Sequence, residues 1–449
     1  MTKSISLFLC VACLFTFLLL VGMQSRIQAT ATSAHPLAED VGVGLSGRPF
    51  LVVQPDSFQQ VRGVYLFLEN LFFANGNFQL FYTRRLLGEC AFEVCDDSES
   101  ITGRSIRSDG SRGRTKVLSF PLSEAGTTLG DFALNTRDRN FSLVWEQSPR
   151  SGKGSPQGLF SEIVGYGGKI LHWNDLKINR YFSPEIQYHS GSNSYIVLNR
   201  FDGEVLVLDA MGKLRANVRN VVPVARAEKH SIGTVAGLDY YSFFWLESFE
   251  PQSSKIRTQK VSIAGTKIGK VTDLTSVKPF APVLLTTTNT DLGEHLLLFD
   301  APGTTPTLHP VYVMRVAADG SRKSGRTFVT NWGGNQSGGQ DTFALAYGNH
   351  NYLILVSRDS NLWATLLSET LDKKQEVQIT FKRKTRKPGY VQYDPVARRW
   401  LVAWQVNPTI GAYKIYGRFL KENPVTGDSS GSTAGTAERA LERRDLEAL

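Results

Sequence analysis

Short apolar stretches recur about every 50 residues along the chain, separated by polar segments rich in turn residues. They are Phe78–Tyr82, Phe141–Trp145, Tyr195–Asn199, Tyr241–Trp245, His295–Phe299, Tyr352–Val356 and Trp400–Trp404. They lack the apolar–polar alternation of a half-exposed strand, so we expect strands that are buried on both faces. No amphipathic helix of about 10–15 residues lies between them, which argues against a parallel α/β fold. The pattern predicts an all-β chain of repeated units with about four strands each.

Further strands are predicted around each apolar stretch. The preceding ones are Phe132–Asn135, Ile186–Tyr188, Val283–Thr287, Phe343–Tyr347 and Val391–Tyr393. The following ones are Ile101–Ile106, Leu159–Val164, Val205–Asp209, Ile256–Val261, Val311–Val316, Trp363–Leu367 and Ile415–Leu420. Glycines at 110, 212, 265 and 320 come just after strands of the second group, where a hairpin turn needs a positive φ.

The last unit carries a recognisable pattern: Tyr393-Asp-Pro395, then Trp400-Leu-Val-Ala-Trp404, then Ile415-Tyr-Gly-Arg-Phe-Leu420. It resembles a repeat common in secreted bacterial proteins, a β-propeller blade. The resemblance spans roughly residues 60–420 across weaker copies, and it implies a fold without implying an activity.

The repeats predict a seven-bladed β-propeller over residues 49–420. The last unit lacks a fourth strand, and Pro49–Val53 is a spare one, so we expect this N-terminal strand to complete the last blade. Residues 32–48 are expected to be a linker. Residues 421–449 are expected to form a polar linker and a weak amphipathic helix.

The N-terminus reads as a secretory signal over residues 1–31, with Lys3, the apolar run Ile5–Met23 and an A-x-A-like site at 28–31. The alternative is an uncleaved signal anchor at residues 5–23, since the run is almost long enough to span a bilayer. Either way we expect a secreted or cell-surface protein. The net charge of +9 allows an acidic partner without requiring one.

Two cysteines remain outside the signal, Cys90 and Cys95, and in an oxidising compartment we expect them to form a disulfide. Two cysteines without a nearby histidine do not make a metal site, and we expect neither a metal nor a cofactor. Asn140 and Asn335 begin glycosylation sequons, usable only in a host that glycosylates.

No catalytic motif of the common hydrolase, metalloprotease or nucleotide-binding kinds occurs in the chain. The candidate catalytic residues are the acids Asp131, Glu185 and Asp341, which stand at starts of predicted inner strands and could converge at one mouth of a central channel. Acids are also common at turns, so the sequence favours a non-enzyme.

A basic face is the other candidate site. The cations Arg84, Arg85, Lys382, Arg383, Lys384, Arg386 and Lys387, with residues 150–153, belong to loops that share one face in a propeller. Such a face could bind an anionic ligand, or it could be a solvated charged surface. Aromatic residues Tyr166, Trp173, Trp332 and Trp363 could stack on sugars, although packing between blades is the commoner role of such residues.

These observations predict a secreted or surface binding and adhesion protein whose partner is an extracellular glycan or protein. Nucleic acid is not an expected partner, because secretion removes it and no aromatic–basic interleaving occurs. A membrane would be involved only through an uncleaved anchor. The alternatives are a polysaccharide-active hydrolase or lyase, and a structural surface or matrix protein.

Overall fold

In a computed structural model, the chain is described over residues 41–424, apart from gaps at 55–63, 87–89, 92–93, 96–97, 120–125, 149–157, 180–181, 183, 200–202, 220, 222–226, 251–252, 278–283, 302–307, 334–342, 359–360, 381–384 and 407–413. Residues Gly42–Asn423 form one compact unit, distinct from the two ends of the chain. The predicted signal, residues 425–449 of the predicted polar tail, Asp341 and Asn335 lie outside the described residues. Within the described part, no helix is long and apolar enough to span a membrane.

The unit Gly42–Asn423 is built from antiparallel strands that repeat in fours. The first strands of the repeats are β2 (Val64–Ala74), β8 (Gly126–Asn135), β12 (Pro184–His189), β16 (Ala227–Thr234), β20 (Leu284–Asn289), β24 (Phe343–Gly348) and β28 (Thr385–Asp394). The second strands are β3 (Asn77–Leu86), β9 (Asn140–Ser148), β13 (Ser194–Asn199), β17 (Tyr240–Glu250), β21 (Glu294–Asp300), β25 (Asn351–Arg358) and β29 (Arg399–Val406). The third strands are β6 (Ser98–Ile106), β10 (Gly158–Gly165), β14 (Val205–Asp209), β18 (Ser253–Ser262), β22 (Leu308–Ala317), β26 (Asn361–Ser368) and β30 (Lys414–Pro424). The fourth strands are β7 (Arg112–Ser119), β11 (Ile170–Asp175), β15 (Leu214–Val218), β19 (Lys267–Val277), β23 (Thr327–Gly333) and β27 (Lys373–Gln378).

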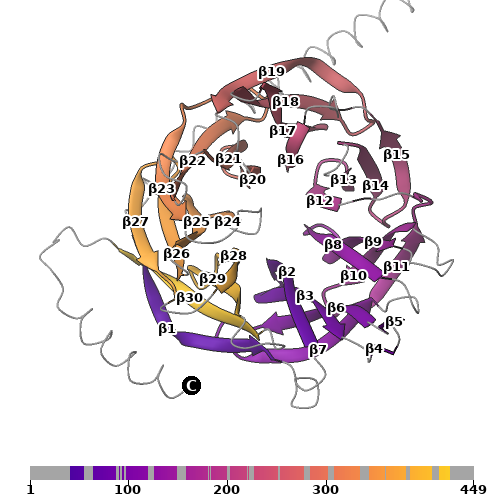
Figure 1. The fold of residues 1–449 in the computed structure, drawn as a ribbon, viewed down its shortest axis with the longest axis vertical. Helices are drawn as coiled ribbons and strands as arrows, with labels where there is room; N and C mark the ends of the chain where they lie inside the picture. The colour runs from indigo at the N-terminus through magenta and orange to yellow at the C-terminus, as the bar shows by residue number, and fades with distance from the viewer. Residues whose placement is uncertain are drawn as a thin grey trace, which may run out of the picture. The chain divides into compact units, whose positions relative to one another are not determined.

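Each repeat forms a meander in which neighbouring strands pair in chain order. The meanders β20–β23 and β24–β27 join into one eight-stranded sheet through a parallel pairing of Gly333 with Arg358. Figure 1 shows the sheets arranged radially, with the first strand of each meander toward the centre and the fourth toward the outside. This is the arrangement of a β-propeller.

The predicted apolar stretches all fall in the second strands, and their expected burial is confirmed. Every residue of β13 and β21 is buried. Because each second strand lies between two sheet neighbours and two neighbouring sheets, both of its faces pack: alternate residues of β13 join two different apolar clusters. The continuous apolar runs in the sequence are therefore a direct consequence of stacking.

The turn glycines behave as predicted. Glycines 110, 212, 265 and 320 have φ between 78° and 86° and close the turns between third and fourth strands. The turn from β2 to β3 is a two-residue Asn75-Gly76 turn with both φ values positive, at 52° and 71°, the conformation that a tight hairpin favours.

The last sheet has the order β1–β30–β29–β28, with β1 running from Val41 to Val53. The expected strand at Pro49–Val53 is thus longer: residues 41–48, expected as linker, are strand, and β30 continues to Pro424. Val43, Val52 and Val53 of β1 are buried. Arg104 and Arg112 of the first meander also donate hydrogen bonds, of 2.6 and 3.0 Å, to the carbonyls of Val52 and Leu51. Strand β1 therefore contacts both the last sheet and the first.

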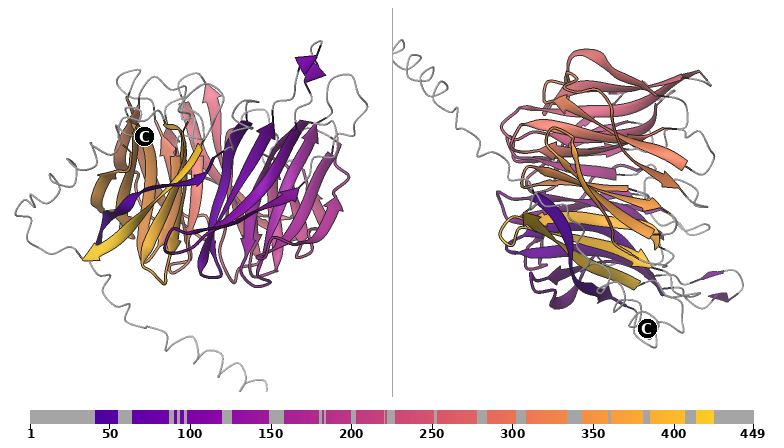
Figure 2. Two further views of the ribbon diagram at one scale, coloured as in Figure 1. Left: turned by 90° about the horizontal axis from the view of Figure 1, so that it is seen from below. Right: turned by 90° about the vertical axis from the view of Figure 1, so that its left-hand side faces the viewer.

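Between β3 and β6 lies a separate two-stranded ribbon, β4 (Cys90–Ala91) and β5 (Val94–Cys95), which projects beyond the longer strands (Figure 2). Cys90 and Cys95 are directly opposed in its register. Directly opposed residues of an antiparallel pair have Cα atoms about 4.5–5.5 Å apart, which is within the range that a disulfide bridges.

We therefore predict that Cys90 and Cys95 form a disulfide when the protein is made in an oxidising compartment. The intact mass of the purified chain should be lower by two hydrogens than that of the reduced chain, and C90S/C95S should show no such difference. Because the ribbon pairs only with itself, we expect reduction to expose it to proteases while the midpoint of global unfolding stays unchanged. Free thiols in protein made in an oxidising compartment would contradict the prediction.

Candidate functional site

The candidate acids Asp131 and Glu185 serve as links between sheets. Asp131 on β8 accepts a hydrogen bond from the amide of Ile186 on β12 (3.0 Å) and one from the side chain of Asn70 on β2 (3.2 Å). Glu185 on β12, only 6% exposed, accepts hydrogen bonds from the amide of Ile232 and the hydroxyl of Ser231 on β16, both at 3.1 Å. Each carboxylate thus binds the first strand of the next sheet, which differs from the expectation that both point into an open channel mouth.

The predicted basic face is described only in part. Arg84 is half-buried on β3, and Arg85, Arg386 and Lys387 lie on strands whose side chains at these positions are not described. Lys382, Arg383, Lys384 and residues 150–153 lie outside the described residues. The basic face stays a prediction.

The sequon at Asn140 is not available in the folded chain. Asn140 is 5% exposed, its side-chain oxygen accepts a hydrogen bond of 2.9 Å from Tyr195, and Ser142 is fully buried. A glycan on this asparagine would have to occupy the space between two sheets, so the expectation of glycosylation there is corrected.

The four aromatic candidates divide into packed and exposed residues. Trp332 is buried and donates its indole hydrogen to Asp300 at 3.0 Å, and Trp363 lies beneath the guanidinium of Arg358 at 4.0 Å. Trp173 on β11 is 49% exposed, with its ring stacked on Phe160. Tyr166 is half-buried in the β10–β11 turn.

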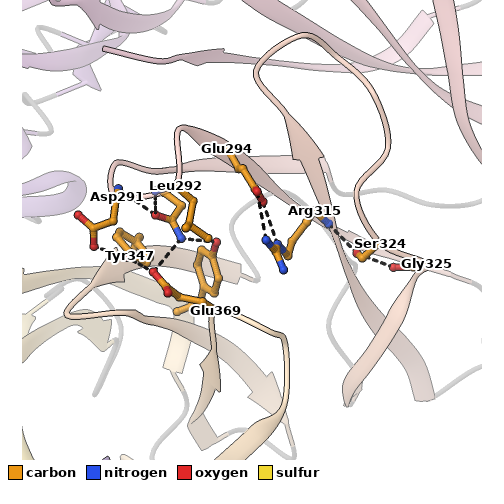
Figure 3. A network of polar contacts seen from close by, with 10 residues as sticks. Asp291, Leu292, Glu294, Arg315, Ser324, Gly325, Tyr347 and Glu369 are labelled. Atoms are coloured by element: carbon orange, nitrogen blue, oxygen red, sulfur yellow. Dashed lines mark hydrogen bonds and ion pairs between the residues drawn. The ribbon is translucent and has the colours of Figure 1, made fainter. Parts of the chain in front are cut away.

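A cluster of polar side chains that sequence reasoning did not find lies where the turns of two meanders meet (Figure 3). We call Asp291, Tyr347, His350 and Glu369 the turn cluster. Asp291 comes from the β20–β21 turn, Tyr347 from the end of β24, His350 from the β24–β25 turn, and Glu369 from the β26–β27 turn. The Tyr347 hydroxyl lies 2.5 Å from carboxylate oxygens of both Asp291 and Glu369.

Histidine and amide groups complete the turn cluster. His350 Nδ1 lies 3.2 Å from Glu369 and 3.5 Å from Asp291. Asn289 donates its side-chain amide to Glu369 at 3.3 Å and to the hydroxyl of Tyr352 at 3.0 Å. Beside the cluster, Arg315 forms a two-pronged ion pair with Glu294, at 2.8 and 3.1 Å.

Protonation decides how this cluster holds together. A tyrosine hydroxyl carries one hydrogen, so it can donate to only one of its two carboxylate neighbours at a time. Burial by itself raises the pKa of Glu369, but hydrogen bonds from Tyr347, Asn289 and His350 and the charge of His350 outweigh it and hold that pKa below its usual value. Burial, followed by the two carboxylate acceptors, raises the pKa of Tyr347, so its hydroxyl stays protonated. The cluster is therefore most strongly bonded when Glu369 is ionised.

The same groups are the described residues that could share a metal ion. One ligand atom each from Asp291, His350 and Glu369 lie within 4.8 Å of one another. Carboxylate and imidazole groups suit several divalent metals. Each of these groups also contacts another member of the turn cluster. The same geometry therefore also fits a structural role, in which the side chains connect neighbouring turns without a metal ion.

We predict that Y347F destabilises the protein by about 1–3 kcal/mol at pH 7, because it removes the donor between two carboxylates. Glu369 has a depressed folded-state pKa, so its contribution is present above the unfolded-state pKa and is lost as pH falls through the folded-state pKa. The difference between wild type and Y347F should therefore shrink between pH 7 and pH values below about 4. Urea unfolding of both proteins at pH 7 and at a pH below about 4 measures this difference in the free energy of unfolding.

The matched control is Y312F, since Tyr312 is a half-buried tyrosine that packs by its ring against Phe299 and Phe328. Equal losses for Y347F and Y312F, or a Y347F effect that does not depend on pH, would contradict this account of the turn cluster.

Comparisons with known proteins give structural neighbours alone. No protein-family model matches the chain, and no curated protein matches it. Among solved structures, the hydrazine synthase of Kuenenia stuttgartiensis is 9% identical, with a TM-score of 0.45 over 76% of this chain and 95% of that chain. The Dos1 propeller is 9% identical, with a TM-score of 0.45 over 85% of this chain and 96% of that chain. An α-L-arabinofuranosidase, Arb93A from Fusarium graminearum, is 12% identical, with a TM-score of 0.40 over 84% of this chain and 98% of that chain.

Proposed function

We propose that the chain is a secreted or cell-surface binding protein, a seven-bladed propeller closed by β1, that recognises an extracellular glycan or protein through its loops and turns. The observation that carries the proposal is the role of the inner-strand acids. Asp131 and Glu185 accept hydrogen bonds from the following sheet, and this use favours a scaffold over a catalytic pair. What remains for function is the set of loops and turns at the two ends of the strands, which rigid sheets hold in place.

The seven-bladed, closed form of the proposal is supported by contacts at the two ends of the described chain. Strand β1 is hydrogen-bonded into the last sheet, and its carbonyls accept hydrogen bonds from the first meander. The side chains of β1 also join the apolar cluster that β3, β29 and β30 share.

The test is binding of the mature chain to an array of neutral and acidic glycans at low and high salt, with analysis of any sugar cleaved. We expect binding without cleavage. Loss of binding on neutralising residues 382–387 would place the ligand on the predicted basic face, where salt should weaken it. Steady release of sugar products would overturn the proposal in favour of a hydrolase or lyase.

A further inference from the structure

A second candidate site lies at the end of the strands opposite the predicted basic face, and the residues that line it are described. A cleft lies between the meander β2–β3–β6–β7 and the meander β8–β11, near the Asn75-Gly76 turn and the β10–β11 turn. Arg84 and Arg85 stand at the opposite end of β3, so this cleft is separate from the predicted basic face. We call it the basic cleft.

One wall of the basic cleft is a single face of the first sheet. Asn77, Gln79 and Phe81 alternate along β3, and Gln79 and Phe81 lie across from Ser105 and Gly103 of β6. Lys116 of β7 in turn lies across from Gly103. The facing wall comes from Phe141 of β9, Val164 of β10 and Tyr166 of the β10–β11 turn.

Two glycines of the lining allow neighbouring groups to approach closely. A side chain at Gly103 would meet Leu118 and Phe81 at 3.2–3.3 Å, so this position can hold nothing larger without displacing the wall. Gly168 has a φ of +75°, and a Cβ there would lie 2.4 Å from the side chain of Lys116, which shows how closely the β10–β11 turn approaches β7.

The charge of the cleft is of one sign. Among the described residues that line it, Arg104, Arg114 and Lys116 are basic and none is acidic. Arg114 and Lys116 lie on the face of Gly103, whereas Arg104 alternates with Gly103 and points to the other face of the sheet, toward β1. Arg104 is held by hydrogen bonds to backbone carbonyls of Val52 and Gly113, whereas Arg114 and Lys116 are exposed. In the part of the chain that the structure describes, no carboxylate forms an ion pair with Arg114 or Lys116.

The remaining lining has the character of a sugar site. The ring of Tyr166 is half-buried against Phe141, with centroids 5.2 Å apart, and Arg139 lies over it at 6.0 Å while donating to Asn75 at 2.8 Å. Aromatic walls stack on the apolar faces of sugar rings, amides such as those of Asn77 and Gln79 bind hydroxyls, and free cations bind carboxylate or sulfate groups.

We propose that the basic cleft binds an acidic oligosaccharide, with Tyr166 against a sugar ring and Arg114 and Lys116 on its anionic groups. This rests on the proposed function, because it names the ligand class of a binding propeller. The shared chemistry is an anionic sugar, and its charge has two sources, carboxylate and sulfate.

The experiment is calorimetric titration of the full chain with a polygalacturonate tetrasaccharide, a sulfated heparin-derived tetrasaccharide and neutral cellotetraose, at low and high salt. We expect one or both acidic probes to bind, more weakly at high salt. R114Q/K116Q should weaken that binding about tenfold or more, the loss of charge-assisted hydrogen bonds. Y166L should also weaken it, and Y166F should keep it within about twofold.

The matched control is K213Q/K270Q, which removes the same charge at two exposed lysines in other meanders. Binding of an acidic probe that R114Q/K116Q leaves unchanged would overturn the basic cleft and leave the proposed function standing. Binding of cellotetraose without binding of either acidic probe would overturn the acidic ligand and leave the proposed function standing. A chain that binds nothing on the glycan array and none of the three probes would overturn the acidic ligand and the glycan form of the proposed function, and leave a protein partner.

Discussion

A chain that begins at residue 55, without β1, is expected to lose most of its stability. Burying a valine contributes about 1.5–3 kcal/mol, so loss of Val43, Val52 and Val53 alone removes about 5 kcal/mol or more. Loss of β1 also leaves one edge of β30 without a hydrogen-bonded neighbour, and it removes the carbonyl acceptors of Arg104 and Arg112. Domains are commonly stable by only about 5–15 kcal/mol, so we expect a melting temperature lower by at least about 10 °C, or no cooperative transition.

The control for this deletion is a chain that begins at Val41, which lacks only residues outside the described part. It should melt like the full chain. A synthetic peptide of residues 41–54, added to the shortened chain, should restore part of the lost stability in a concentration-dependent way. Equal melting temperatures for the two chains would show that β1 does not hold the last sheet to the first.

The variant E185A is expected to have a free energy of unfolding lower by about 2–3 kcal/mol. The amide of Ile232 and the hydroxyl of Ser231 lose their hydrogen-bond acceptor between two sheets. E185Q keeps an acceptor oxygen and should cost less. D131A should behave like E185A, since the amide of Ile186 loses its partner. Denaturant unfolding of the three variants measures these differences.

The control is D239A, which removes a carboxylate from an exposed turn and should change stability by less than about 0.5 kcal/mol. The competing role for Glu185 and Asp131 is catalysis. Variants that keep wild-type stability but lose a sugar-cleaving activity would establish that role and refute the structural one.

The part of the fold that could be predicted is the part that is buried. Second and third strands such as β13 and β14 are apolar because neighbouring sheets cover them, and their sequences record this burial. The fourth strands escaped a residue-level prediction. Strand β11 is exposed over most of its length, so nothing in Ile170–Asp175 had to be apolar in a regular pattern. Strands β2 and β16 were missed as well, although β2 is largely apolar.

The candidate site was less predictable because it depends on packing between repeats. Asp131 reads as an ordinary acid near a strand start, and its partner is an amide 55 residues later. The turn cluster unites residues 291, 347, 350 and 369, whose closeness arises only when turns of successive meanders are stacked. A tyrosine near the end of the first strand of a repeat is the sequence signal that could have pointed to such polar clusters. Tyr188, Tyr347 and Tyr393 all donate their hydroxyls to polar side chains.

The pairing of β1 with β30 also determines when the last sheet can form during synthesis of the chain. Strand β1 is made before the other strands of this unit, and its partner strand β30 is made after them. While the chain is being synthesised, β1 has no sheet to join, and each later meander can fold on its own neighbours in sequence. The final step must then join segments about 370 residues apart, a pairing that loop-closure entropy makes slow. The growing chain thus carries β1 without its partner strand until β30 has been made.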